Sequence, residues 1–140
     1  MAGERILIVD DYEDGRLMYC EYLRHIGYDA TSAADGNEAL RCATTKTCDV
    51  IVLDIAMPKL DGLEVLRKLR GNESTKDVPV IILSASVDKR VRDEAASAGA
   101  DLFLTKPCEP EQLDRAIRQV LISRLLAGAK DARKANPPKP

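Results

Sequence analysis

Four short apolar runs in this chain are each followed closely by a residue that can take part in phosphoryl chemistry. These residues are Asp10 and Asp11 after residues 6–9, Asp54 after 50–53, Ser84 after 80–83, and Lys106 shortly after 102–104. Ligands of open parallel sheets bind at the edge where the carboxyl ends of the strands meet, so we expect these side chains to converge there. Carboxylate oxygens suit Mg²⁺, and ammonium and hydroxyl groups suit phosphoryl oxygens. The sequence therefore predicts a site for a divalent cation and a phosphoryl group.

The aspartate after the second of these runs is the best candidate for a nucleophile. An aspartate carboxylate can attack phosphorus and form an aspartyl-phosphate. Asp54 ends the most apolar run, which we expect to be a central strand that holds its backbone rigid. Phosphoryl transfer needs charge neutralisation and in-line positioning more than further covalent help. A cation on the aspartates and the Lys106 ammonium would supply the charge, and the Ser84 hydroxyl would donate a hydrogen bond to a phosphoryl oxygen.

The runs that carry these residues are rich in Ile and Val and too short for helices. They are typical of strands buried on both faces, as in a parallel sheet. Residues 28–33 are more polar and fit a fifth strand at a sheet edge. Apolar residues at helical spacing predict five helices, over residues 14–26, 36–45, 60–70, 88–98 and 110–126. Strands that alternate with helices through right-handed crossovers predict an α/β fold with a doubly wound, five-stranded parallel sheet.

The length and composition fit one globular domain with a short basic end. We predict a domain over residues 4–126 and a basic Ala/Lys/Pro tail or linker stub over 127–140. No run approaches membrane-spanning length and the N-terminus lacks a signal-peptide pattern, so we expect a cytoplasmic protein without a membrane partner. The net charge of −2 gives no strong attraction to nucleic acid, and direct binding to nucleic acid is not expected.

Taken together, the motifs resemble the receiver domain of two-component response regulators, the chemotaxis-regulator-like family. The matching segments are Ile8-Val9-Asp10-Asp11, Leu53-Asp54-Ile55-Ala56-Met57-Pro58 with Asp61-Gly62 after it, Leu83-Ser84-Ala85, and Lys106-Pro107. The resemblance covers residues 5–122, which is nearly the whole chain. It implies the flavodoxin-like receiver fold, in which five helices flank strands in the spatial order 2-1-3-4-5.

The resemblance also implies a role for each residue of the predicted site. Asp54 would accept a phosphoryl group from a histidine kinase or a phosphotransfer protein. Asp10, Asp11 and Asp54, together with the backbone carbonyl of Ala56, would bind Mg²⁺. Ser84 and Lys106 would bind the phosphoryl group, and the Lys106–Pro107 peptide bond would be cis. Phosphorylation and dephosphorylation would be self-catalysed, so the chain is not expected to be an enzyme with a separate substrate.

Phe103 matches the aromatic residue that the family uses as a switch. Phosphorylation of Asp54 would draw Ser84 toward the site and let Phe103 turn inward. The face made by helix 88–98, strand 101–104 and helix 110–126 would then change its preference for an unidentified downstream protein. This makes the chain a phosphorylation-dependent signalling switch. The helix over 88–98 has few apolar residues, which fits an element that can shift.

Two other functions are compatible with parts of this pattern. A Mg²⁺-dependent phosphohydrolase of the haloacid-dehalogenase type also uses an aspartate nucleophile, but it has a second Asp two residues later, where this chain has Ala56. A constitutive interaction module could keep the fold and lose the chemistry, but all the site residues are present here. Labelling by acetyl phosphate in the presence of Mg²⁺ distinguishes the three possibilities.

Overall fold

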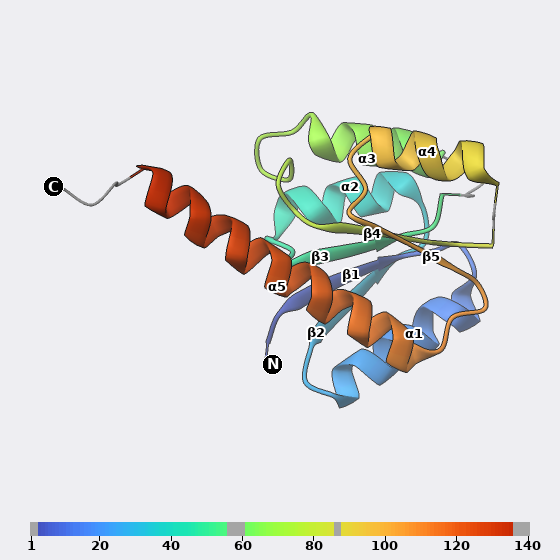
Figure 1. Cartoon of the computed structure of the whole chain (residues 1–140). Helices are drawn as coiled ribbons and strands as arrows, with labels where there is room; N and C mark the ends of the chain where they lie inside the picture. Colours follow the sequence, from blue (N-terminus) through green and yellow to red (C-terminus); the bar gives the residue numbers. More distant parts are fainter. Residues whose placement is uncertain (1–2, 56–60, 86–87, 136–140) are drawn as a thin grey trace, which may run out of the picture.

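Five parallel strands form one sheet at the centre of the molecule, in the order β2-β1-β3-β4-β5 (Figure 1). The computed structural model of the chain describes residues 3–55, 61–85 and 88–135. The strands are β1 (Arg5–Val9), β2 (Asp29–Ala33), β3 (Val50–Leu53), β4 (Val80–Ser84) and β5 (Leu102–Thr105). The predicted number, direction and spatial order of the strands are therefore confirmed, and the polar strand β2 lies at an edge.

Helices cover both faces of this sheet. They are α1 (Glu13–His25), α2 (Gly36–Thr45), α3 (Gly62–Arg70), α4 (Lys89–Ser97) and α5 (Pro110–Ala135). Figure 1 shows α1 and α5 on one side of the sheet and α2, α3 and α4 on the other. This is the doubly wound α/β arrangement that the alternation of strands and helices predicted.

The strands are buried on both faces, which explains their continuous apolar sequences. Successive side chains of a strand point to opposite faces of the sheet. Ile6 of β1 belongs to the core cluster that includes Leu23 of α1 and Ile117 of α5. Its neighbour Leu7 belongs to the second cluster, which includes Leu66 of α3. Every position of a central strand therefore faces a buried layer, where a polar side chain would destabilise the fold.

Aspartate side chains fix the first turn of three helices. Each accepts a hydrogen bond from a backbone N–H of the turn that follows, which satisfies one of the unpaired donors at a helix start. The pairs are Asp35 with the N–H of Glu38, Asp61 with that of Leu63, and Asp88 with that of Arg90. The helices α2, α3 and α4 thus begin at defined residues just beyond the carboxyl edge of the sheet.

Two helix boundaries differ from the prediction by more than one residue. The helix predicted over residues 60–70 begins at Gly62 in the structure, and residue 60 lies outside the described residues. The helix predicted to end at 126 continues to Ala135, and Figure 1 shows α5 projecting beyond the sheet. Residues 127–135 are mostly Ala, Lys and Arg, which are strong helix formers, and the first proline after them is Pro137. The change to a basic composition predicts the end of the helix at 126, but Ala, Lys and Arg themselves favour helix, so the helix continues.

The helices differ in how firmly they are held. In α4 only Ala95 is buried, which agrees with its small number of apolar residues and leaves this helix weakly anchored. In α3 five residues are buried.

Among the described residues, no helix combines the length and the apolar composition that crossing a bilayer would require.

Gly62 lets α3 begin in direct contact with the peptide that follows Asp54. Its backbone N–H donates to the carbonyl oxygen of Ile55 at 3.2 Å. A Cβ atom at this position would overlap the Cα atom of Ile55 and lie 2.5 Å from the carbonyl oxygen of Asp54. Neither contact involves a flexible side chain that could move away. Position 62 therefore requires glycine, because any side chain there would collide with the backbone that follows β3.

We expect Gly62→Ala to lower the free energy of unfolding by about 3 kcal/mol, because the added methyl group forces the two backbone segments apart. Gly128→Ala on α5 is the matched control, since a Cβ atom there meets nothing within 4 Å. That variant should be neutral or stabilise the protein by up to about 1 kcal/mol through helix propensity. Urea denaturation followed by circular dichroism measures both changes. Equal effects at the two positions would contradict the packing argument.

Candidate functional site

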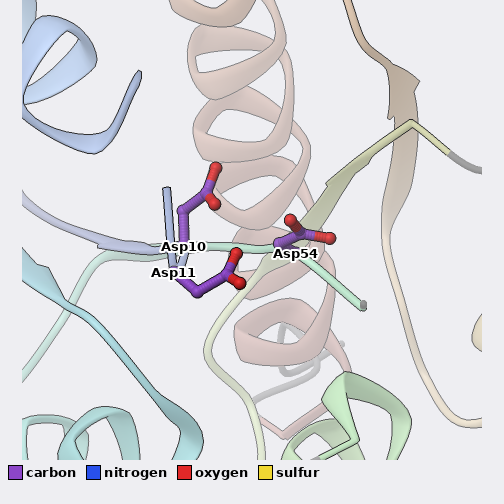
Figure 2. A group of neighbouring side chains, drawn as sticks. All are labelled: Asp10, Asp11 and Asp54. Atoms are coloured by element: carbon purple, nitrogen blue, oxygen red, sulfur yellow. The ribbon is translucent and has the colours of Figure 1, made fainter. Parts of the chain in front are cut away.

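Three aspartates gather where β1 and β3 end. Figure 2 shows Asp10, Asp11 and Asp54 grouped at this edge of the sheet. Each offers a carboxylate oxygen, and these three oxygens lie within 4.8 Å of one another. Asp10 and Asp54 are almost fully buried, whereas Asp11 is exposed. The structure thus brings together the three carboxylates that the sequence placed at the ends of two strands.

Main-chain hydrogen bonds hold the two buried aspartates in line with the strands. The N–H of Asp10 donates to the carbonyl of Ala33 at 3.1 Å, and the N–H of Asp54 donates to the carbonyl of Val9 at 3.0 Å. Both bonds continue the pattern of the parallel ladder one step beyond the regular strands. The positions of Asp10 and Asp54 therefore depend on strand pairing rather than on loop conformation.

Lys106 reaches the buried carboxylates from the segment after β5. Its Nζ atom lies 2.7 Å from Oδ2 of Asp10 and 3.3 Å from Oδ2 of Asp54. Burial lowers the pKa of Lys106, but the hydrogen bond to Asp10 and the charges of Asp54 and Asp10 outweigh this, so the pKa lies above that of an ordinary lysine. The ammonium group therefore stays charged and compensates part of the negative charge at the strand ends.

The backbone around Lys106 has the form that the family resemblance implied. The peptide bond between Lys106 and Pro107 is cis. The N–H of Lys106 donates to the carbonyl of Ser84 at 2.9 Å, which ties this segment to the end of β4. Ser84 itself is 1% exposed and pairs in register with Thr105 of β5. Ser84 and Lys106 thus lie at the same edge of the sheet as the aspartates.

Phe103 lies in the middle of β5 and is half-buried. The guanidinium carbon of Arg92, from α4, lies 5.1 Å from the centroid of the Phe103 ring, within the range of a cation–π contact. Phe103 also packs against the core cluster on that face, as does Val91 of α4. The ring is therefore a contact between β5 and the weakly anchored helix.

Two residues bear on the predicted metal site in different ways. Ala56, whose carbonyl the resemblance assigned to the metal, lies outside the described residues, so its part stays a prediction. Arg16 of α1 was not singled out from the sequence. Its Nη1 atom donates to the carbonyl oxygen of Asp10 at 2.9 Å, next to the aspartate cluster. An arginine on an amphipathic helix carries no sequence signal of a hydrogen bond to a particular backbone carbonyl.

A cavity of about 400 Å³ opens beside the aspartates, between α1 and the segment after β5. Its lining includes Asp10, Met18, Tyr19, Lys106 and Pro107. A small molecule could therefore approach Asp10 and Lys106 from this side.

The donor set fits Mg²⁺. This ion takes oxygen ligands in octahedral geometry and usually keeps several waters while bound by a small number of carboxylates. Asp10 and Asp54 provide buried oxygens, and the exposed Asp11 leaves one side of the cluster open to solvent. A bound cation would relieve the repulsion between the three carboxylates and still have positions for a phosphoryl oxygen.

Comparisons with known proteins agree with this geometry. The family model described as response regulator receiver domain matches residues 6–118. The chain is 42% identical over 121 residues to the probable transcriptional regulator ycf27 of Porphyridium aerugineum, covering 86% of this chain and 49% of that protein. The chain spans about half the length of the curated relatives that it matches.

Solved structures show the same relationship. The chemotaxis protein CheY4 of Vibrio cholerae superposes with a TM-score of 0.82 at 34% identity, covering 86% of this chain and all of CheY4. The response regulator TrrA of Thermotoga maritima, solved in complex with Mg²⁺ and BeF, superposes with a TM-score of 0.75 at 34% identity, covering 84% of this chain and 99% of TrrA. With its sheet order, its acidic cluster and a family match over most of its length, the chain belongs to the response regulator receiver domain family.

Proposed function

We propose that this chain is a phosphorylation-dependent switch in which Asp54 accepts a phosphoryl group from a histidine kinase or a phosphotransfer protein. The observation that carries the proposal is the convergence of Asp54 with Asp10, Asp11 and the Lys106 ammonium at one edge of the sheet. Receiver domains act as signalling switches, and this chain has both the fold and the charged groups that such a switch needs.

The proposed roles of the residues combine the positions of the described side chains with the family resemblance. One carboxylate oxygen of Asp54 forms a bond to phosphorus while the bond between phosphorus and the leaving atom of the donor breaks. Asp10, Asp11 and Asp54, with the carbonyl of Ala56, would hold Mg²⁺. When bound, the ion supplies charge neutralisation for the phosphoryl oxygens. The Asp10 and Asp54 backbones are fixed by strand pairing, which keeps the nucleophile in place during transfer.

Lys106 and Ser84 would respond to the new group. The Lys106 ammonium now contacts one oxygen of Asp54 and one of Asp10. A phosphoryl group on Asp54 brings additional negative oxygens into reach of this ammonium, so Lys106 would form an ion pair with them. The Ser84 hydroxyl, at the end of the neighbouring strand, would donate a hydrogen bond to a further oxygen. Loss of the group by hydrolysis would use the same residues, without a separate enzyme.

The output surface would be the face made by α4, β5 and α5. Phosphorylation can shift this face only if the phosphoryl group binds one of two conformations better than the other. The half-buried Phe103 and the lightly held α4 are the elements on which a second conformation would cost least. A downstream protein would then distinguish the two conformations.

Absence of direct binding to nucleic acid stays a prediction, since the relative ycf27 is named a probable transcriptional regulator.

Incubation with acetyl phosphate and Mg²⁺ should add one phosphoryl group to the wild-type chain, as measured by intact mass. Asp54→Asn should abolish the gain, because an amide cannot act as the carboxylate nucleophile. Asp93→Asn, an exposed position on α4, is the matched control and should label normally. Labelling that survives in Asp54→Asn would refute the assignment of the phosphoacceptor. Failure of the wild type to label would favour an interaction module without the chemistry.

We expect Mg²⁺ to raise the melting temperature of the unphosphorylated protein and Lys106→Met to increase this response. A ligand that binds only the folded state at about one hundred times its dissociation constant stabilises it by roughly 2.7 kcal/mol. Lys106→Met removes the compensating ammonium, so without Mg²⁺ the variant should lose about 2 kcal/mol, and Mg²⁺ should restore much of the loss. Thermal unfolding with and without millimolar Mg²⁺ measures both effects.

The control for this measurement is Lys76→Met, because Lys76 pairs only with the exposed Glu73 among the described residues. That variant should respond to Mg²⁺ as the wild type does. A melting temperature of the wild type that does not change with Mg²⁺ would count against the metal site. Equal Mg²⁺ responses in the two lysine variants would count against charge compensation by Lys106.

A further inference from the structure

A buried hydrogen bond links α1 to the segment that carries Lys106. The hydroxyl of Tyr19 donates to the carbonyl oxygen of Cys108 at 2.7 Å, and both groups are buried. The two residues are 89 positions apart in the sequence, so the bond exists only in the folded protein. The Tyr19 side chain is 5% exposed, which means that its hydroxyl has little access to water as an alternative partner.

The bond holds the middle of a short segment between β5 and α5. Lys106 is tied at the near end by its N–H bond to the Ser84 carbonyl, and Glu109 at the far end by a bond from its N–H to the Gln112 side chain at 3.0 Å. The segment also contains Pro107, which has no N–H to contribute. The Cys108 carbonyl, two residues after Lys106, is the point at which α1 holds the segment.

Tyr19 also lies close to the charged groups of the site. It lines the same cavity of about 400 Å³ as Asp10 and Lys106. Burial raises the pKa of Tyr19, with smaller raising contributions from Cys108 and Asp10, and the charge of Lys106 lowers it in part. The hydroxyl therefore stays protonated at neutral pH and remains a hydrogen-bond donor.

We propose that Tyr19 is a positioning residue for Lys106. By fixing the Cys108 carbonyl, Tyr19 sets the place from which the Lys106 ammonium reaches Asp10, Asp54 and a phosphoryl group on Asp54. This inference rests on the proposed function of the site. Groups that bind a reacting centre must be held within fractions of an ångström, and a second layer of hydrogen bonds supplies that precision. Tyr19 acts through Cys108 and does not contact the phosphoryl group.

A specific consequence separates this role from a general role in stability. Binding of Mg²⁺ uses the aspartate cluster, in which strand pairing holds the backbones of Asp10 and Asp54. A Lys106 that is displaced by a fraction of an ångström keeps its charge beside these carboxylates, so loss of the Tyr19 hydroxyl should change Mg²⁺ binding little. Binding of a phosphoryl group uses Lys106, so it should weaken. Positioning therefore predicts that the affinity for a phosphoryl analogue falls while the affinity for Mg²⁺ stays the same.

Tyr28 provides a matched control. It is also 5% exposed, and its hydroxyl also makes a buried long-range bond to the region of α5, to Oδ1 of Asp114 at 2.8 Å. It precedes β2 at Asp29, which pairs with Arg5 at the start of β1, so it lies at the amino edge of the sheet, opposite the site. Tyr19→Phe and Tyr28→Phe each remove one buried hydroxyl and keep the ring, and melting curves verify that both fold.

The experiment measures three quantities in the wild type, Tyr19→Phe and Tyr28→Phe: the affinity for Mg²⁺, the affinity for beryllium fluoride at saturating Mg²⁺, and the labelling rate with acetyl phosphate. We expect Tyr19→Phe to weaken beryllium fluoride binding by roughly fivefold to tenfold, the range for one misplaced hydrogen bond. Its affinity for Mg²⁺ should stay within about twofold. Tyr28→Phe should change each of the three measured quantities by no more than about twofold.

A double-mutant comparison tests whether Lys106 carries the effect. In a Lys106→Met background, Tyr19→Phe should have little further effect on beryllium fluoride binding, because the group that it positions is absent. An undiminished effect in that background, or equal effects of Tyr19→Phe and Tyr28→Phe, would overturn the inference. Failure of the wild type to bind beryllium fluoride would instead overturn the proposed function, so the two failures are distinguishable.

Discussion

Concentrated negative charge at the carboxyl edge of the sheet is the constraint on which the rest of the site depends. Asp10 and Asp54 are almost fully buried, and a buried carboxylate without a counter-charge is costly. In the structure described here Lys106 compensates both through a single ammonium group. The segment that carries Lys106 must therefore be held in place, and contacts from β4 and α1 provide this. A cation or a phosphoryl group alters the same charge balance, which makes the edge responsive to both.

The molecule separates the elements that hold this charge from those that can respond to it. The strands β1 and β3 are buried on both faces, and ladder hydrogen bonds hold the backbones of Asp10 and Asp54 at their ends. The helix α4 has a single buried residue, and its contact with β5 includes Arg92 lying over the half-buried Phe103 ring. A second conformation costs least where few apolar contacts must be broken. Chemistry at the strand ends and adjustment at α4 and β5 are thus compatible in one small domain.

Most of the fold could be predicted because burial leaves a clear local pattern. Strands such as 50–53 are continuous runs of Val, Ile and Leu since both faces are covered, and the helices between them show one apolar face. The predicted end of α5 at residue 126 was wrong, because residues 127–135 differ from the rest of the helix in composition but still favour helix. The site aspartates and Lys106 were predictable because parallel strands place their carboxyl ends together. The contribution of Ala56 lies outside the described residues.

The sequence alone indicated which chemical groups follow which strands, because residue type and order along a strand are local properties. It indicated in the same way that the sheet is parallel and covered on both sides. The folded structure was needed to show which distant groups meet: Lys106 with Asp10, the Tyr19 hydroxyl with the Cys108 carbonyl, and Gly62 with the peptide after Asp54. Such contacts depend on how helices pack onto the sheet, and no local pattern records the partner of a side chain dozens of residues away.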